Sequence, residues 1–248
     1  MRRLITIPIS HYCEKARWAL DRAGLDYEEH RHIQVVHIAA CRLAGGGATS
    51  PVLVCEEGVF SESGSIVGYA ARHAPPDRAL EPDDPVERAE AMAVERWLDV
   101  DFGADARRWT YFHIEKQPEL IRKYNPTGVP AWERVLFPLA MPVVAAAIRK
   151  VLDITPETAA RSKRRVWETF DAIGERLSDG RPFLVGDRFS RADLTWAALA
   201  GAVLAPPQYG VPLPQPDEME ASVADQVRAF REHPAGAFAM RIWATERR

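Results

Sequence analysis

The chain has 248 residues, a formal net charge of −3 and a hydrophobic fraction of 47%, values typical of a soluble protein that can bury a full core. This mild acidity, without any block of like charge, excludes nucleic acid and a polybasic membrane contact as predicted partners. The three cysteines, Cys13, Cys41 and Cys55, have no C-x-x-C spacing. They therefore predict neither a disulfide framework nor a zinc ribbon, and they fit a reducing, cytoplasmic setting.

The stretch Ser10–Leu20 predicts a change from strand to helix near the N-terminus. Residues 4–7 form a short apolar run before it, and alanine and leucine recur at helical spacing within it. Ser10 is expected to be the helix N-cap, with its hydroxyl over the free N–H groups of the first turn. A helix start of this kind attracts anions and would stabilise a thiolate.

The first seventy-odd residues predict a small α/β unit. Residues 34–50 show little periodicity and are expected to form a loop around the glycine run 45–47, which lacks the Lys-Ser/Thr of a phosphate-binding loop. The other predicted elements are, in order, a strand at 4–7, a helix ended by Gly24, strands within 26–33, 50–55 and 59–60, and a helix that begins within 61–70.

The second half of the chain predicts only helices. A proline-rich polar stretch from His73 to Pro85 indicates a linker. Ser190 and Asp193 have the spacing of a capping box and mark the start of an apolar central helix. The predicted helices lie at 86–115, 156–177, 191–204 and 219–232.

One nearly uncharged run, Val135 to Ile148, interrupts this pattern. It contains Pro138 and Pro142 and is too short to cross a bilayer. We expect it to be buried or to roof a pocket, so the sequence predicts no membrane partner.

These features, taken together, resemble the glutathione transferase family. The resemblance depends on the order along the chain of Ser10–Leu20, Pro51–Leu53, Glu62–Ser63, the proline-rich linker and Gly186–Asp193. It implies an α/β plus all-α fold, in which a helical-bundle domain follows a thioredoxin-like domain. The implied boundaries are 1–74 for the thioredoxin-like, glutathione-binding domain, 75–85 for the linker and 86–248 for the all-helical C-terminal domain.

The resemblance also implies a glutathione site in the first domain. Ser10 matches the serine that activates the glutathione thiol in serine-type members, and Pro51 matches the cis-proline, so Ser50 would offer its backbone to the cysteinyl part. Glu62 and Ser63 match the residues that hold the γ-glutamyl group. Lowering a thiol pKa by two units requires about 2.7 kcal/mol. A helix N-terminus supplies roughly 0.3–2 kcal/mol and a hydrogen bond to a charged acceptor roughly 1.5–3 kcal/mol, so the two suffice together.

Three other residues of the first turn leave the catalytic assignment open. Tyr12 could supply the hydroxyl instead of Ser10, or it could pack beneath the domain. Cys13 aligns with the second, resolving cysteine of glutaredoxins and is more readily understood as a partly buried thiol than as a nucleophile. His11 would add positive potential if protonated, or it would be exposed. Ser10 itself could be only a helix cap.

The predicted helix 86–115 lies where family members line the pocket for the electrophile. Any aromatic residue there can belong to the core or to the pocket wall. Arg108 is expected to bind a polar or anionic group of the ligand. The candidate pocket residues are His11, Trp97, Asp101, Arg108, Trp109 and Tyr111.

The sequence departs from the family at the glycine end of glutathione. Thr49 occupies a position where many members have Lys or Gln, and an unusual glycine run precedes it. A different small thiol is therefore an alternative. His30, His32 and His37 lack a fourth ligand and are expected on a solvated surface, so no metal is predicted.

The expected function is conjugation of glutathione, as co-substrate, to a small, mostly apolar electrophile, in a cytoplasmic enzyme of detoxification. The resemblance implies a homodimer, with no nucleic acid and no membrane among its partners. Two alternatives remain. One is a non-catalytic binding or scaffold protein of the same fold, and the other is a glutathione-dependent thiol–disulfide oxidoreductase that uses Cys13.

Overall fold

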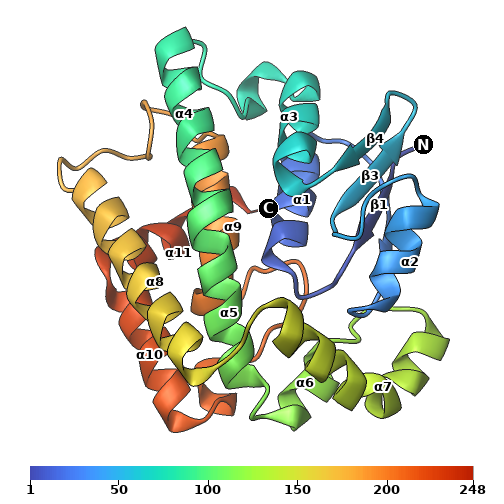
Figure 1. The fold of residues 1–248 in the computed structure, drawn as a ribbon. Helices are drawn as coiled ribbons and strands as arrows, with labels where there is room; N and C mark the ends of the chain where they lie inside the picture. Colours follow the sequence, from blue (N-terminus) through green and yellow to red (C-terminus); the bar gives the residue numbers. More distant parts are fainter. Residues whose placement is uncertain (248) are drawn as a thin grey trace.

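The computed structural model describes residues 1–247, so Arg248, the last residue of the predicted helical domain, lies outside the described residues. Four strands form one mixed sheet in the order β2-β1-β3-β4 (Figure 1). β1 and β2 are parallel, whereas β3 is antiparallel to both β1 and β4. The strands are β1 (Arg3–Thr6), β2 (Glu28–Arg31), β3 (Val52–Cys55) and β4 (Gly58–Ser61).

Three helices cover the two faces of this sheet. Because side chains alternate along a strand, Leu4 and Leu53 join the main core with α1 (His11–Arg22) and α3 (Ser63–His73). The neighbouring Ile5 and Val52 form a separate cluster with Cys41 of α2 (Val36–Leu43). The predicted α/β unit is confirmed, with α1 and α3 on one face and α2 on the other (Figure 1).

The expectation of a loop over residues 34–50 is wrong, because α2 forms there. The sequence signal is weak since Cys41 is the one buried residue of this short helix, and Val35, which precedes it, has no side-chain cap and a φ of 75°. Two of the glycines that follow are required by the local backbone geometry. Gly45 ends the helix at a φ of 85°, and a Cβ on Gly46 would lie 2.8 Å from Val52 Cγ2.

The remainder of the chain is helical and surrounds α9. Every residue of α9 except Ala202 is buried, as expected for the central helix of a bundle. The helices are α4 (Pro85–Trp97), a π-helical segment (Leu98–Phe102), α5 (Gly103–Ile114), α6 (Pro118–Tyr124), α7 (Ala131–Val151), α8 (Pro156–Arg176), α9 (Arg191–Leu204), α10 (Ala221–Glu232) and α11 (Pro234–Glu246), with short 3₁₀ turns at Pro76–Arg78 and Pro216–Glu218.

Two helix predictions need correction. The single helix expected over 86–115 is divided into α4 and α5 by the π-helical segment, which adds a residue to one turn. The helix expected at 219–232 is α10, but it is not the last one. Pro234 resembles a stop signal in the sequence, whereas it occupies the first turn of α11 behind His233 as N-cap, where proline is favoured.

The expectation that residues 135–148 are buried or line a pocket holds for one face only, where Phe137, Met141, Val144, Ala145 and Ile148 line a small cavity with Tyr111 and Ile121. Residues 135–148 belong to α7, which lies along the lower edge of the molecule in Figure 1. Phe137 and Val144 are buried, but Val135, Leu139 and Val143 are exposed by 71, 80 and 71%. The helix is long and apolar enough to cross a membrane by length and composition.

Buried ion pairs join the two halves of the chain. Lys15 on α1 is fully buried, and its Nζ lies 2.8 Å from Glu95 Oε1 and 2.7 Å from Asp99 Oδ2. Arg191, at the start of α9, donates to the other oxygen of Glu95. Removal of one partner from such a pair leaves a buried charge uncompensated, which costs about 3–5 kcal/mol.

The predicted capping box at the start of α9 is confirmed. The Ser190 hydroxyl accepts from the N–H of Ala192, and Asp193 Oδ2 accepts from the N–H of Ser190 at 2.9 Å. Asp193 Oδ1 also accepts from the N–H of Leu184 at 2.7 Å, and its side chain is fully buried. This carboxylate therefore anchors both the helix start and the loop that leads to it.

We predict that Asp193→Ala lowers the free energy of unfolding by about 2–4 kcal/mol, because it removes a cap and leaves a buried N–H unsatisfied. Urea denaturation of the two proteins measures this difference. Asp187→Ala, at an exposed carboxylate of the same loop, is the control and should change stability by no more than about 0.5 kcal/mol. Equal effects of the two substitutions would contradict the prediction.

Candidate functional site

Ser10 is the N-cap of α1, as predicted. Its backbone is extended, with φ −73° and ψ 122°, and its Oγ accepts from the N–H of Cys13 at 3.4 Å. The residue is half-buried and lines a cavity. A hydroxyl in this place can donate its own proton to an anion that occupies the helix N-terminus.

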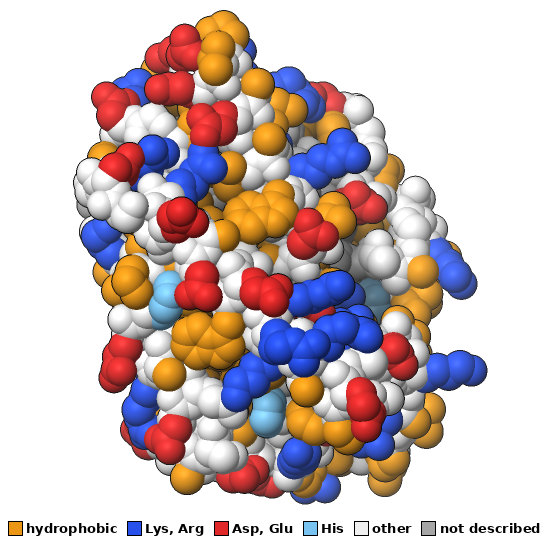
Figure 2. All heavy atoms as spheres, turned by 60° about the vertical axis from the view of Figure 1, so that its left-hand side comes forward, with side chains coloured by type: hydrophobic (Ala, Val, Ile, Leu, Met, Phe, Trp, Pro, Cys, Tyr) orange, Lys and Arg blue, Asp and Glu red, His pale blue; other side chains and the backbone are white. Residues whose placement is uncertain are grey.

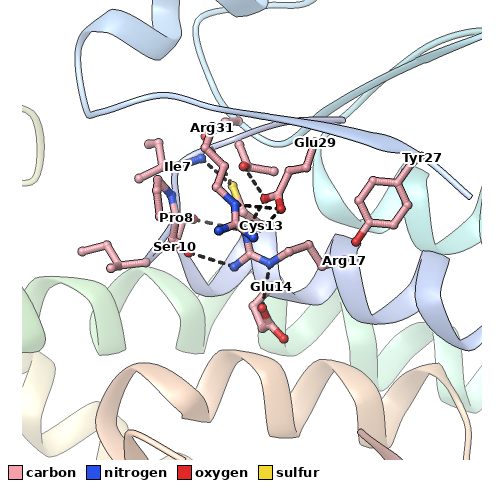
Figure 3. A network of polar contacts seen from close by, with 12 residues as sticks. Ile7, Pro8, Ser10, Cys13, Glu14, Arg17, Tyr27, Glu29 and Arg31 are labelled. Carbon is pink, nitrogen blue, oxygen red and sulfur yellow. Dashed lines mark hydrogen bonds and ion pairs between the residues drawn. The ribbon is translucent and has the colours of Figure 1, made fainter. Parts of the chain in front are cut away.

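The turn before Ser10 is held by the buried guanidinium of Arg17 (Figure 3). Its Nη2 donates to the carbonyl of Pro8 at 2.8 Å, its Nε to Glu14 Oε2 at 2.7 Å and its Nη1 to Glu29 Oε1 at 2.9 Å. Although burial opposes it, the two carboxylates raise the pKa of Arg17, so the guanidinium remains charged. β2 and α1 are thereby tied to the loop that carries the N-cap.

Cys13 lies below this turn and not in the cavity. It is fully buried; its Sγ accepts from the N–H of Ile7 at 3.3 Å and donates to Ser50 Oγ at 3.5 Å. Burial raises the pKa of the Cys13 thiol. A buried, protonated thiol is a poor nucleophile, so the geometry favours the structural alternative for this residue.

Tyr12 packs between the two halves of the molecule. Its hydroxyl donates to the carbonyl of Asp99 at 2.8 Å, and a Cβ on Gly103 would lie 2.2 Å from the Tyr12 oxygen. Burial raises the pKa of Tyr12 to about 12. The hydroxyl is thus engaged by the π-helical segment, which leaves that of Ser10 for a ligand.

His11 is neither exposed nor protonated, and both expectations for it are wrong. The side chain is 4% exposed, and its Nε2 lies 3.1 Å from the carbonyl of Gly103. Burial, aided by the nearby charge of Arg107, lowers the pKa of His11 to about 3. The neutral ring lines the cavity as a polar wall without adding positive potential.

Ser50, Pro51, Glu62 and Ser63 lie together beside the first turn. The Ser50–Pro51 peptide bond is cis, and the N–H of Glu62 donates to the carbonyl of Pro51 at 3.2 Å. Glu62 has a φ of 73°, a conformation that costs a residue with a Cβ about 1–3 kcal/mol and is concentrated at ligand sites. Its carboxylate is exposed, whereas Ser63 is buried in the first turn of α3.

A cavity of about 150 Å³ leads from Ser10 into the helical half. His11 and Tyr111 line it, and so does Trp109. Tyr209, from the irregular segment after α9, also lines it and donates to the carbonyl of Ile9 at 3.1 Å. Most of the other lining residues are apolar: Ile7, Ile9, Ile114, Leu120, Ile121, Ala202, Val203, Leu213, Met219, Val223 and Val227.

Trp97, Asp101 and Arg108 do not line this cavity, which corrects their prediction. Trp97 packs against the main core, and Asp101 is exposed. Arg108 turns the other way, where it donates to the Leu152 carbonyl at 2.7 Å and pairs with Asp105 at 2.8 Å. Arg108 also donates to the Ser162 hydroxyl of α8 at 2.9 Å, so its guanidinium is occupied and attaches α5 to the end of α7 and to α8.

Arg107, which the sequence analysis did not select, takes the place expected for Arg108. It lines the cavity, and its Nε is buried without a hydrogen-bond partner. No Asp or Glu among the described residues lines the cavity, and His113 is neutral because burial lowers its pKa to about 4. Arg107 is thus the one fixed charge among the described residues of a mostly apolar wall.

The three candidate histidines of the second strand region have separate contacts. His30 pairs with Glu28 at 2.9 Å, and burial lowers the pKa of His37 to about 4. His32 Nδ1 lies 2.6 Å from the buried Glu133 of α7, so it joins α7 to the end of β2 and is not part of a solvated surface. Within residues 1–247, no group of three or more His, Cys, Asp or Glu side chains could hold a metal ion.

The fold and site define a thioredoxin-like domain followed by a helical domain, with a cavity between them. The glutathione S-transferase N-terminal domain model matches residues 4–78, and the C-terminal domain model matches residues 136–217. The chain belongs to the glutathione S-transferase family. No curated protein matches it in sequence.

Solved structures of this family share the fold. A glutathione S-transferase from Xanthobacter autotrophicus Py2 is 16% identical, with a TM-score of 0.61 over 99% of this chain and 93% of that one. One from Sinorhizobium meliloti 1021 is 18% identical, with a TM-score of 0.61 over 99% of each chain. One from Methylobacterium radiotolerans JCM 2831, in complex with glutathione sulfonate, is 20% identical, with a TM-score of 0.55 over 96% of this chain and 94% of that one.

The low pKa of His11 predicts how stability depends on pH. Below pH 6.5 the unfolded chain binds a proton at His11 that the folded protein excludes down to about pH 3, so the free energy of unfolding falls as the pH falls. The loss is at most about 1.4 kcal/mol per pH unit. Between pH 7 and pH 5, wild type should lose about 2 kcal/mol more than His11→Gln in urea denaturation. Equal losses would show that His11 is not held neutral.

Proposed function

We propose that this protein conjugates the thiol of glutathione to a small, mostly apolar electrophile that carries one acidic group. The observation that carries the proposal is the position of Ser10, a hydroxyl at a helix N-terminus that opens into an apolar cavity. Family membership supports glutathione as the co-substrate. It also supports a cytoplasmic location and a homodimer, and light scattering would test the dimer.

In this mechanism Ser10 stabilises the glutathione thiolate. The thiol proton leaves to solvent, and the hydroxyl of Ser10 donates a hydrogen bond to the sulfur at the N-terminus of α1. The sulfur then attacks an electrophilic carbon, forming a C–S bond, while a leaving group departs with the electron pair of the bond that breaks. The apolar cavity excludes water from this step.

The remaining groups are placed to hold the tripeptide. Ser50, which precedes cis-Pro51, contacts Cys13 in the first turn of α1 and would offer its backbone to the cysteinyl part, and the exposed Glu62 carboxylate can pair with the γ-glutamyl amine. Ser63 and the free N–H groups of the first turn of α3 suit the γ-glutamyl carboxylate. Thr49, which precedes Ser50, is exposed and offers a hydroxyl in place of a longer side chain.

Arg107 defines the electrophile class. A guanidinium with a buried, unpartnered Nε in an apolar wall costs free energy unless an anion binds to it. Ser10 and Arg107 line the same cavity, so one ligand can present its reactive carbon to the thiolate and its acidic group to Arg107. A carboxylate would pair with the planar guanidinium through two hydrogen bonds.

We predict that Ser10→Ala lowers kcat/KM for conjugation about tenfold to a hundredfold, because it removes one hydrogen bond to a charged sulfur. Glutathione affinity, measured by calorimetry, should change less. Cys13→Ala is the control and should conjugate at nearly the wild-type rate. Full activity in Ser10→Ala would exclude the assignment of Ser10 as the residue that stabilises the thiolate.

Two further results would favour the alternative functions. Loss of reduction of a mixed disulfide in Cys13→Ala would favour the oxidoreductase alternative. Absence of a heat signal in calorimetry with millimolar glutathione would favour a non-catalytic protein.

We predict that Arg107→Met discriminates between electrophiles of different charge. With a chloronitrobenzene that bears a carboxylate, kcat/KM should fall about tenfold to a hundredfold, because the charged hydrogen bonds are lost. With the same compound lacking the carboxylate it should change by less than about threefold. Arg122→Met, at an exposed arginine of α6, is the control for loss of charge alone. Equal loss with both compounds would contradict the proposed role.

A further inference from the structure

The outward face of α7 is an apolar stripe with cations near its ends. Trp132, Leu136, Leu139 and Val143 follow one another at spacings of four, three and four residues, which places them on one side of the helix. They are 56, 48, 80 and 71% exposed. Contiguous apolar surface of this kind marks a contact site in a folded protein.

The opposite face of the same helix is fixed to the protein. Phe137 packs with Ile33 and Val129, and the buried Glu133 accepts from the N–H of Ile33 at 2.8 Å. Glu133 also pairs with His32. Because this inner face is already packed, the exposed stripe is a second apolar face that no described residue covers.

The charges that α7 itself exposes are of one sign. They are Arg134, Arg149 and Lys150, whereas Glu133, the one acidic residue of α7, is buried. Arg149 is paired with Glu115 at 2.9 Å, so Arg134 and Lys150 carry the charge that is left for a partner. Residues 115–153 contain six Lys or Arg, three Glu and one Asp, a net charge of +2 in a chain of −3. On the side where α8 and α4 lie, by contrast, acidic and basic side chains intermingle (Figure 2). The outer surface of α7 is therefore complementary to an anionic, apolar partner.

A second copy of the chain does not satisfy this charge pattern. Antiparallel packing of two α7 helices would set the end that carries Arg134 against the end of the other helix that carries Lys150, with no exposed carboxylate on either helix. Like charges opposed in this way are destabilising. An anionic lipid surface instead accepts both the apolar side chains and the cations, at about 1 kcal/mol per Lys or Arg near the membrane.

We propose that α7 docks this protein, in the plane of the interface, on membranes that contain anionic lipids. Leu136, Leu139 and Val143 enter the outer acyl region, Trp132 lies at the headgroup level, and the cations contact the phosphates. The helix does not span the bilayer, because Glu133 and its partner His32 would have to leave their buried pair. The expectation of no membrane partner depended on the short length of the apolar run, on the lack of a block of like charge and on the expected burial of residues 135–148, but one face of this run is exposed.

The test is cosedimentation of the full-length protein with vesicles. Phosphatidylcholine vesicles that contain phosphatidylglycerol should bind the protein, pure phosphatidylcholine should bind it at least about tenfold more weakly, and added salt should release it. Leu139→Glu should weaken binding to the anionic vesicles about tenfold or more, since it removes a leucine side chain that the membrane would bury. Lys150→Glu combined with Arg134→Glu should do the same through charge.

The controls separate docking from misfolding and self-association. Val86→Glu is the matched control, because Val86 is a 76% exposed apolar residue on α4, outside the stripe. This variant carries the same added charge and should bind like wild type. Val143→Glu is a second stripe variant if Leu139→Glu unfolds at a lower temperature. Absence of wild-type binding to anionic vesicles, or unchanged binding by both stripe variants, would overturn the proposal. So would light scattering in which Leu139→Glu converts a dimer to a monomer.

Discussion

The buried guanidinium of Arg17, shared among Glu14, Glu29 and the Pro8 carbonyl, holds the turn from which the site is built. Each of the three acceptors belongs to a different part of the N-terminal unit: the helix, the second strand and the loop between β1 and α1. Loss of the guanidinium would leave two carboxylates without their common partner, a cost of several kcal/mol. The position of Ser10 thus depends on a buried charge that does not line the cavity.

Features with local signals could be predicted from the sequence. The N-cap role of Ser10 and the capping box of Ser190 and Asp193 depend on residues within three positions of one another, and both are present. Elements without such signals were missed. The helix α2 has one buried residue and no side-chain cap, and α11 begins at a proline that follows another helix. Periodicity carries little information in these two cases, since tertiary packing decides the outcome.

The cavity wall was predicted less well because its residues depend on the phase of a long helix. The π-helical segment adds one residue between Trp97 and the cavity, which shifts the face of everything beyond it by about 100°. Trp109 and Tyr111, beyond this segment, line the cavity, and so does Arg107, while Arg108, about 100° from Arg107 round the helix, is taken by Asp105 and the Leu152 carbonyl. The burial predicted for the apolar run in α7 was incomplete for a related reason, because composition shows that a segment is apolar but not which of its faces packs against the protein.

The burial of Lys15 between Glu95 and Asp99 has a consequence for how the chain can be divided. A fragment that ended in the linker would expose an ammonium group whose counterions had gone, together with Trp18, whose ring lies against Phe189 and Trp243. The thioredoxin-like half is in this sense an incomplete folding unit, which obtains part of its core and its charge balance from residues eighty or more positions away. Splitting, grafting or circularly permuting this chain at the linker would separate α1 from the surroundings that make it a helix with a functional N-terminus.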